Sequence, residues 1–209
     1  MTSKPSRMTI ATGLLATATI VLAGCAIGTG IADAPATGAP NRPTHHAPSA
    51  PVTVTASETI GGVLVTSRDG LIDSAPISEL EDTPAITGLD ADLRRALEAA
   101  TRAASADGVD VLVNSGWRSK HYQQALLDQG IEQYGSLEAA RRWVNTPEKS
   151  SHVRGQAVDV GPTDAMSWMD QHGSRFGLCR TYANEMWHFE LATTPGGDCP
   201  ATLPDGSAG

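Results

Sequence analysis

The sequence predicts an α+β domain, in which helices and short strands follow one another without a regular strand–helix–strand order. Segments with a helical spacing of apolar residues are mixed with short runs rich in valine. The chain has 209 residues, of which 40% are hydrophobic and 18% are charged. This length and composition predict one compact domain with appendages at its ends.

Four short segments are predicted to be strands, at residues 62–66, 109–114, 157–160 and 186–191. The first three are rich in valine and the last contains alternating aromatic residues, which is typical of strands. Asp159 lies between two valines of the third segment. A carboxylate inside an apolar strand is costly unless it is paired or binds a metal, so Asp159 is a candidate functional residue.

Four longer segments are predicted to be helices, at residues 90–106, 119–129, 136–144 and 163–172. We expect Gly130 and Gly173 to end the second and the fourth helix, and Thr163 to cap the start of the fourth. The chain has only nine aromatic residues, four of which are tryptophan. The tryptophans, at 117, 143, 168 and 187, are therefore expected to supply bulky packing in the core.

The first 25 residues have the features of an export signal. Lys4 and Arg7 precede an apolar run, and small residues lead to Cys25, which is the order of a secretory signal peptide. Residues 22–25, Leu-Ala-Gly-Cys, resemble a bacterial lipobox. We expect residues 1–24 to be a lipoprotein signal peptide and Cys25 to carry the lipid, at the outer face of the cell membrane. The alternative is an ordinary signal peptide with a chance cysteine.

The ends of the mature chain differ in composition from its middle. Residues 25–58 consist mainly of Ala, Pro, Gly, Thr and Ser, and few of them could bury apolar surface. We expect the lipidated cysteine and a flexible linker there, a folded domain at 59–202, and a flexible tail at 203–209.

Export also determines how the other two cysteines are interpreted. In an oxidising compartment Cys179 and Cys199 are expected to form a disulfide that closes a loop of about 20 residues. Two buried, reduced thiols are the alternative.

The formal net charge of −8 argues against binding to nucleic acid, because such binding requires lysine and arginine to neutralise phosphates. A negative protein also gains nothing from an anionic lipid surface, so a lipid would have to hold it at the membrane. No apolar stretch of 18 or more residues lies inside the body of the chain, which excludes a polytopic membrane protein.

His152, Asp159 and His188 are candidate ligands of a zinc ion. An extended chain would hold the Cα atoms of His152 and Asp159 about 23 Å apart, too far for one ion. Residues 153–155 would have to reverse the chain, and Gly155 permits such a turn. A solvated surface side chain would explain each of these residues taken alone.

Glu185 precedes His188 by three residues, so we place it in the turn that enters the last strand, on the open side of the metal. Three protein ligands with one open position are typical of a catalytic zinc site. Glu185 would then deprotonate a zinc-activated water that attacks a carbonyl.

Three motifs together resemble those of the VanY/VanX-type zinc D-Ala-D-Ala carboxypeptidases and dipeptidases. They are Ser-Gly-Trp-Arg-Ser at 115–119, Ser-x-His-x6-Asp at 150–159 and Glu-x-x-His at 185–188. They occur in the family's order over about residues 85–192. The resemblance implies a hedgehog/DD-peptidase-like α+β fold, with a small antiparallel sheet and flanking helices. It also implies one Zn²⁺ held by His152, Asp159 and His188, with Glu185 as general acid/base.

By the same resemblance, Arg118 stabilises the oxyanion or binds the carboxyl end of the substrate, while Gln123 and Ser150 contact the substrate. A planar guanidinium suits a carboxylate, although a surface arginine paired with an acid is the alternative. The sequence departs from the family at Trp117, where the family often has tyrosine, and in its additional cysteine pair.

The predicted function is that of an exported zinc metallopeptidase, a D,D-carboxypeptidase that releases the terminal D-Ala of peptidoglycan stem peptides. The same machinery would serve an L-Ala-D-Glu endopeptidase or a D-Ala-D-Ala dipeptidase. A non-catalytic module that keeps zinc for folding is a further alternative, although a structural site has no use for the free base Glu185. The expected partners are a stem peptide ending in D-Ala-D-Ala and, through the lipid on Cys25, the membrane. The chain is expected to be a monomer that binds no nucleic acid.

Overall fold

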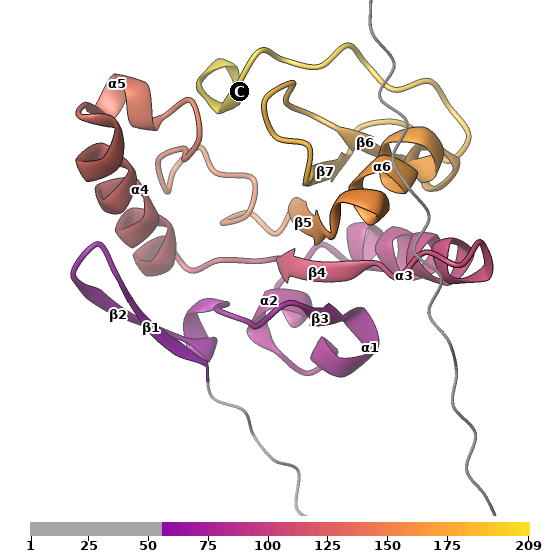
Figure 1. Ribbon diagram of the computed structural model, residues 1–209, viewed down its shortest axis with the longest axis horizontal. Coiled ribbons are helices and arrows are strands. Elements are labelled where there is room, and N and C mark those ends of the chain that lie inside the picture. Colours follow the sequence, from indigo (N-terminus) through magenta and orange to yellow (C-terminus); the bar gives the residue numbers. More distant parts are fainter. Residues whose placement is uncertain (1–55) are drawn as a thin grey trace, which may run out of the picture. The chain divides into compact units, whose positions relative to one another are not determined.

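The computed structural model describes residues 56–209, and Figure 1 shows its α+β architecture. The predicted signal peptide, Cys25 and nearly all of the predicted linker lie outside the described residues. The first strand begins at Ser57, two residues before the predicted start of the domain. Between residues 56 and 209, no helix has both the length and the apolar character needed to cross a membrane.

A five-stranded antiparallel sheet forms the centre of the fold, which confirms the predicted fold class. Its strands, in spatial order, are β3 (Ala75–Pro76), β4 (Leu112–Ser115), β5 (Ala157–Gly161), β7 (His188–Leu191) and β6 (Leu178–Arg180). The register places Ser115 on one side of Asp159 and His188 on the other. Strands β3 and β6 have only two and three residues, too few to give a sequence pattern.

The main core lies on one face of this sheet, beneath α3 (Ala91–Ala106) and α6 (Thr163–His172). Leu93 and Leu97 of α3 are fully buried there, as their helical spacing predicts. Because side chains alternate along a strand, Val158 and Val160 of β5 enter this core while Asp159 points to the opposite face. The alternation therefore separates the carboxylate from the apolar core.

The other described elements flank the sheet. They are a hairpin of β1 (Ser57–Ile60) and β2 (Val63–Thr66), and the helices α1 (Ile77–Leu80), α2 (Pro84–Thr87), α4 (Lys120–Tyr134) and α5 (Leu137–Ala140). The hairpin packs against α4 in Figure 1, and a second small core of Ile60, Val65, Leu71 and Ala125 fills the space between them.

Three predicted helix boundaries differ from the structure. The helix predicted at 136–144 is the short α5, which ends at Ala140. Helix α4 continues through Gly130 to Tyr134 and ends instead at Gly135, which has a left-handed φ of 81°. Gly130 faces α5, and a Cβ atom on it would make ordinary contact with the Cβ atom of Ala140 at 3.5 Å. Helix α6 has Pro162 at its N-cap, so Thr163 is the first helical residue and not the cap.

The C-terminal segment also differs from the predicted flexible tail at residues 203–209. Leu203 forms a bridge with Tyr182, and Gly206–Ala208 form a 3-10 turn. The Arg142 guanidinium pairs with Asp205, with 3.0 Å between Nε and Oδ2. These contacts hold the segment against the domain, and the local composition gave no sign of them.

Cys179 of β6 and Cys199 form the predicted disulfide, which closes a loop across 20 residues of sequence. A loop of this length restricts the unfolded chain by about 3 kcal/mol in the chain-entropy model. We therefore expect Cys199→Ser to lower the free energy of unfolding by about 3 kcal/mol in urea denaturation. Reducing agent should destabilise the wild type equally and leave the variant unchanged. Equal stability of the two oxidised proteins would contradict this expectation.

Candidate metal centre and active-site cleft

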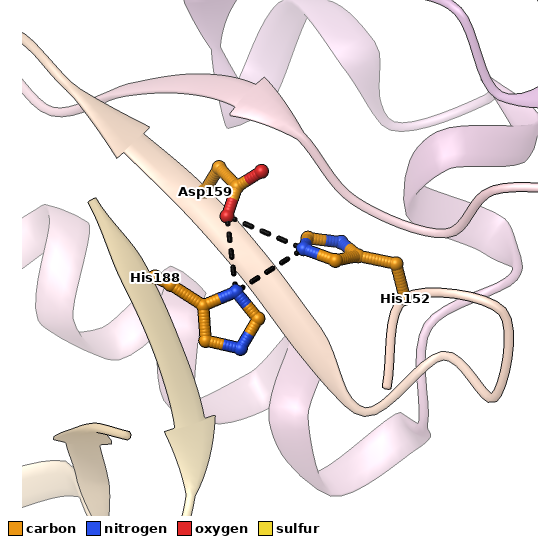
Figure 2. A group of neighbouring side chains, drawn as sticks. All are labelled: His152, Asp159 and His188. Carbon is orange, nitrogen blue, oxygen red and sulfur yellow. Dashed lines mark hydrogen bonds and ion pairs between the residues drawn. The ribbon is translucent and has the colours of Figure 1, made fainter. Parts of the chain in front are cut away.

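Three elements bring His152, Asp159 and His188 together, and Figure 2 shows their side chains pointing toward one another. Asp159 on β5 and His188 on β7 are direct cross-strand partners, so their side chains leave the sheet side by side. His152 arrives from the turn before β5. Gly155 reverses that turn with φ of 71°, and a Cβ atom there would lie only 2.3 Å from the Gly88 carbonyl oxygen. The predicted reversal is therefore confirmed.

The three converging atoms fit a single zinc ion. His152 Nε2 lies 3.3 Å from Asp159 Oδ1 and 3.2 Å from His188 Nδ1, and the distance from His188 Nδ1 to Asp159 Oδ1 is 3.2 Å. An ion in tetrahedral coordination, at about 2.0–2.1 Å from each ligand, would hold the ligand atoms about 3.3–3.4 Å apart. All three residues are buried, so water competes little for these atoms.

The opposite ring nitrogens of both histidines have partners of their own. Nδ1 of His152 lies 2.8 Å from the carbonyl oxygen of Gly116. A carbonyl oxygen only accepts, so Nδ1 carries the proton and Nε2 keeps its lone pair for a metal. His188 Nε2 lies 2.8 Å from Glu190 Oε1, which leaves Nδ1 facing the site. Such outer contacts orient metal-binding imidazoles.

Glu190 is a functional residue that the sequence reasoning did not single out. Its signal was the two-residue spacing from His188, which places both side chains on one face of the last strand. Removal of such an outer partner typically weakens metal binding by about 10–100-fold. We expect Glu190→Ala to weaken zinc affinity by about this factor, measured by competition with a chromophoric chelator. The exposed Glu138 provides the control, and a Glu190→Ala affinity equal to that of Glu138→Ala would exclude the assigned role.

The electrostatics of the site favour a charged aspartate beside one neutral and one protonated imidazole. Burial lowers the pKa of His188, but its hydrogen bonds with Asp159 and Glu190 raise that pKa to about 9. Burial works against ionisation of Asp159, but His152, His188 and Arg118 hold its pKa well below the usual range. Burial and the nearby Arg118 lower the pKa of His152. Arg118 Nη2 donates to Asp159 Oδ2 at 2.6 Å, which leaves Oδ1 as the oxygen that faces both histidines.

Glu185 lies beside the group of His152, Asp159 and His188 without joining it. It lies in the turn before β7, as predicted, and its Oε2 is 3.7 Å from His188 Nδ1. Burial raises the pKa of Glu185 to about 7, although the neighbouring His188 acts in the opposite direction. A carboxylate of this kind, next to a metal position and open to the cleft, can accept and return a proton.

Arg118 is held from three sides. Its Nε donates to Ser115 Oγ at 2.8 Å and its Nη1 to Gln123 Oε1 at 3.3 Å, in addition to the bond with Asp159. Gln123 is buried and donates in turn to the Asn145 carbonyl oxygen at 2.8 Å. Gln123 thus fixes the guanidinium in the site, whereas direct substrate contact by Gln123 stays a prediction.

Ser150 is also buried, and its hydroxyl accepts a hydrogen bond from the Val153 amide at 3.4 Å. This bond lies inside the turn that carries His152. Ser150 also lines the cleft, where its predicted contact with substrate stays a prediction.

A small cleft of about 60 Å³ opens over these residues. Besides the residues named above, Trp143, Val144, Asn145, Ser151, Tyr182, Trp187 and Gly206 line it. The prediction that all four tryptophans pack in the core is wrong for Trp143, which is 42% exposed, and for Trp187, which is half-buried outside the main core, and both line the cleft. The arrangement combines a metal position, a free carboxylate and a fixed guanidinium in one small cavity.

Comparison with known proteins agrees with this arrangement. A family model described as VanY, D-alanyl-D-alanine carboxypeptidase, matches residues 87–193, which include every residue of the metal position, Glu185 and Arg118. The chain belongs to the VanY family. A VanY-family relative from Enterococcus faecalis, a D-alanyl-D-alanine carboxypeptidase, is 33% identical. That match covers 42% of this chain and 42% of the relative, so the chain spans less than half of the relative's length.

Solved structures similar to this VanY-family chain include two whose names also contain VanY. One is a mutant of the vancomycin resistance D,D-pentapeptidase VanY from a VanB-type cassette, in complex with Zn(II), with 27% identity and a TM-score of 0.48. That match covers 57% of this chain and 78% of the other. VanYB in complex with D-Alanine-D-Alanine has 26% identity and a TM-score of 0.48, with coverage of 57% and 76%.

Proposed function

We propose that this protein is a zinc-dependent D,D-carboxypeptidase that removes the terminal D-Ala of peptidoglycan stem peptides. Membership of the VanY family supports action on a D-alanyl-D-alanine bond. The observation that carries the proposal is the position of Glu185, a buried carboxylate that stands beside the ligand triad and opens to the cleft. A site that bound zinc only for folding would not need this group.

The residues of the site would have separate roles in metal binding and proton transfer. His152, Asp159 and His188 would hold the zinc ion, which when bound supplies Lewis-acid activation of a water molecule and of the scissile carbonyl. Glu185 takes a proton from the attacking water and passes it to the leaving amine. The bond between the carbonyl carbon and that amine breaks, which releases D-Ala.

Arg118 contributes a positive group whose orientation is set before substrate binds. Asp159, Gln123 and Ser115 each take one of its nitrogens, so little ordering is needed when a substrate arrives. Its remaining N–H donors suit the carboxylate of a peptide's last residue or the developing oxyanion. This fixed guanidinium favours an enzyme that acts at the carboxyl end of a peptide.

Localisation is a proposal drawn from the sequence. The lipobox-like residues 22–25 suggest that the mature protein begins at a lipidated Cys25 and acts at the outer face of the cell membrane. Residues 26–56 would then link the lipid to the domain. Metabolic labelling with an alkyne fatty acid tests this, with Cys25→Ala as the control; equal labelling of both proteins would refute it.

The direct test of the activity is release of D-Ala from a synthetic stem peptide that ends in D-Ala-D-Ala. Protein stripped of metal should be inactive, and one equivalent of zinc should restore the release. Mass spectrometry of digested peptidoglycan fragments separates the alternatives by their products. Free D-Ala supports the proposal, the dipeptide D-Ala-D-Ala indicates a dipeptidase, and a cut between L-Ala and D-Glu indicates an endopeptidase. Zinc binding with no cleavage at all would favour a structural module.

A further inference from the structure

The segment that enters the cleft from the C-terminal side is here called the strap, residues 203–208. At its start, Leu203 is hydrogen-bonded to the turn that carries Glu185. The Leu203 amide donates to the Thr181 carbonyl oxygen at 2.9 Å, and the Ala183 amide donates to the Leu203 carbonyl oxygen at 2.8 Å. The strap is thereby joined to one wall of the cleft.

The far end of the strap is joined to the opposite wall, the turn after α5. Asn145 Nδ2 donates to the Gly206 carbonyl oxygen at 2.8 Å, and the Gly206 amide donates to the Arg142 carbonyl oxygen at 3.3 Å. Asp205 adds the ion pair with Arg142 and also accepts from the Ser207 amide at 3.0 Å. The strap therefore connects the two walls between which the cleft opens.

Gly206 is the strap residue that faces Glu185. It is buried and lines the cleft, and a Cβ atom added to it would lie 3.4 Å from Glu185 Oε1. Its backbone lies outside the left-handed region, so a larger residue could adopt the same conformation. The space beside the carboxylate is therefore limited by the strap and would be filled by a side chain at position 206.

The strap lies beyond residue 193, where the match to the VanY family ends. The family assignment therefore says nothing about this wall of the cleft. The disulfide ties the strand that precedes the Glu185 turn to Cys199, four residues before the strap begins. The pairing of β6 with β7 therefore fixes both ends of the Glu185 turn. The disulfide fixes the chain just before the strap to the same strand pair.

We propose that the strap is a specificity-determining wall and that Gly206 sets the size of the terminal residue accepted beside Glu185. This inference rests on the proposed carboxypeptidase function. Glu185 must lie within hydrogen-bond reach of the leaving amine to protonate it, so the terminal residue that carries this amine lies next to Gly206. The small volume there suits the methyl side chain of D-Ala. A larger side chain, either on the terminal residue of the substrate or at position 206, would collide.

The test compares peptides that end in D-Ala-D-Ala and in D-Ala-D-Leu. We expect Gly206→Leu to reduce kcat/KM on the first peptide by at least about tenfold, mainly through a higher KM, since even one methylene in a pocket discriminates by about 10–200-fold. Gly206→Ala should have an intermediate effect. Ala201→Leu places a leucine at an exposed position outside the strap and should stay within about twofold of wild type.

Deletion of residues 203–209 should relax the selectivity for a small terminal residue. We expect the preference for D-Ala over D-Leu to fall by at least about tenfold, because the open cleft admits the larger residue. Asp205→Ala, which removes the Arg142 anchor without shortening the chain, should shift the preference in the same direction. Hydrogen exchange at the Ala183 amide, which the strap protects, should become faster in the deletion variant whatever the activity.

The outcomes separate the two proposals. An active enzyme whose preference is unchanged in both Gly206→Leu and the deletion variant would overturn the inference and leave the proposed function standing. Unchanged hydrogen exchange at Ala183 in the deletion variant would also overturn it, because the strap would then not be docked. A zinc-loaded wild type that releases D-Ala from neither peptide would overturn the proposed function and the inference with it.

Discussion

Replacing Glu185 with glutamine is expected to reduce kcat for D-Ala release by about 10²–10⁴-fold, the usual contribution of a general acid–base group. Glutamine has nearly the shape of glutamate but cannot take up a proton. Because Glu185 stands outside the His152–Asp159–His188 triad, zinc content should remain at one equivalent. The measurement is steady-state release of D-Ala together with metal analysis of the same preparation.

Glu132 provides a matched control, since it is an exposed glutamate on α4, remote in sequence from the ligand triad. Glu132→Gln should retain the activity of the wild type. Full activity in Glu185→Gln would remove Glu185 from the mechanism. Loss of zinc in Glu185→Gln would instead indicate that Glu185 is a ligand.

Asp159→Asn is expected to weaken zinc binding by more than the 10–100-fold that is typical for loss of an outer partner, because the variant removes the negative charge from the ligand set. The amide keeps the shape of the carboxylate and can still accept the hydrogen bond from Arg118, so the variant should keep its fold. D-Ala release should fall in parallel with zinc content. Affinity is measured by competition with a chelator of known strength.

Asp110 offers the matched control for this substitution. It is exposed and precedes β4, at the end of this strand that lies away from Ser115 and the site. Asp110→Asn should bind zinc as the wild type does. Equal zinc affinity in Asp159→Asn and wild type would show that Asp159 is not a ligand.

The convergence of His152, Asp159 and His188 could be predicted from the sequence, because simple physical constraints act on these residues. A carboxylate within the apolar β5 predicted a paired or metal-bound Asp159, and the structure pairs it with Arg118 and two histidines. The reversal at Gly155 was required by the distance between His152 and Asp159. Glu185 was placed correctly in the turn because a regular strand would have pointed it away from His188.

Other features depend on contacts between distant segments and left no local pattern. The C-terminal segment looks disordered by composition, but its hydrogen bonds to Asn145 and Ala183 hold it in the cleft. Trp143 was assigned to the core by composition alone, whereas its position after α5 brings it to the cleft mouth. Helix α4 likewise passes Gly130 and ends at Gly135, and the local pattern did not distinguish between these two glycines.

Two imidazoles and one carboxylate are expected to bind a single zinc ion where β5, β7 and the turn before β5 meet. Zinc K-edge X-ray absorption of protein loaded with one equivalent reports this ligand set. We expect imidazole scattering from two histidines and light-atom ligands at about 2.0–2.2 Å, and we expect His188→Ala to lose one of these imidazoles. Sulfur scattering at about 2.3 Å, or an identical spectrum in His188→Ala, would exclude the set of ligands formed by His152, Asp159 and His188.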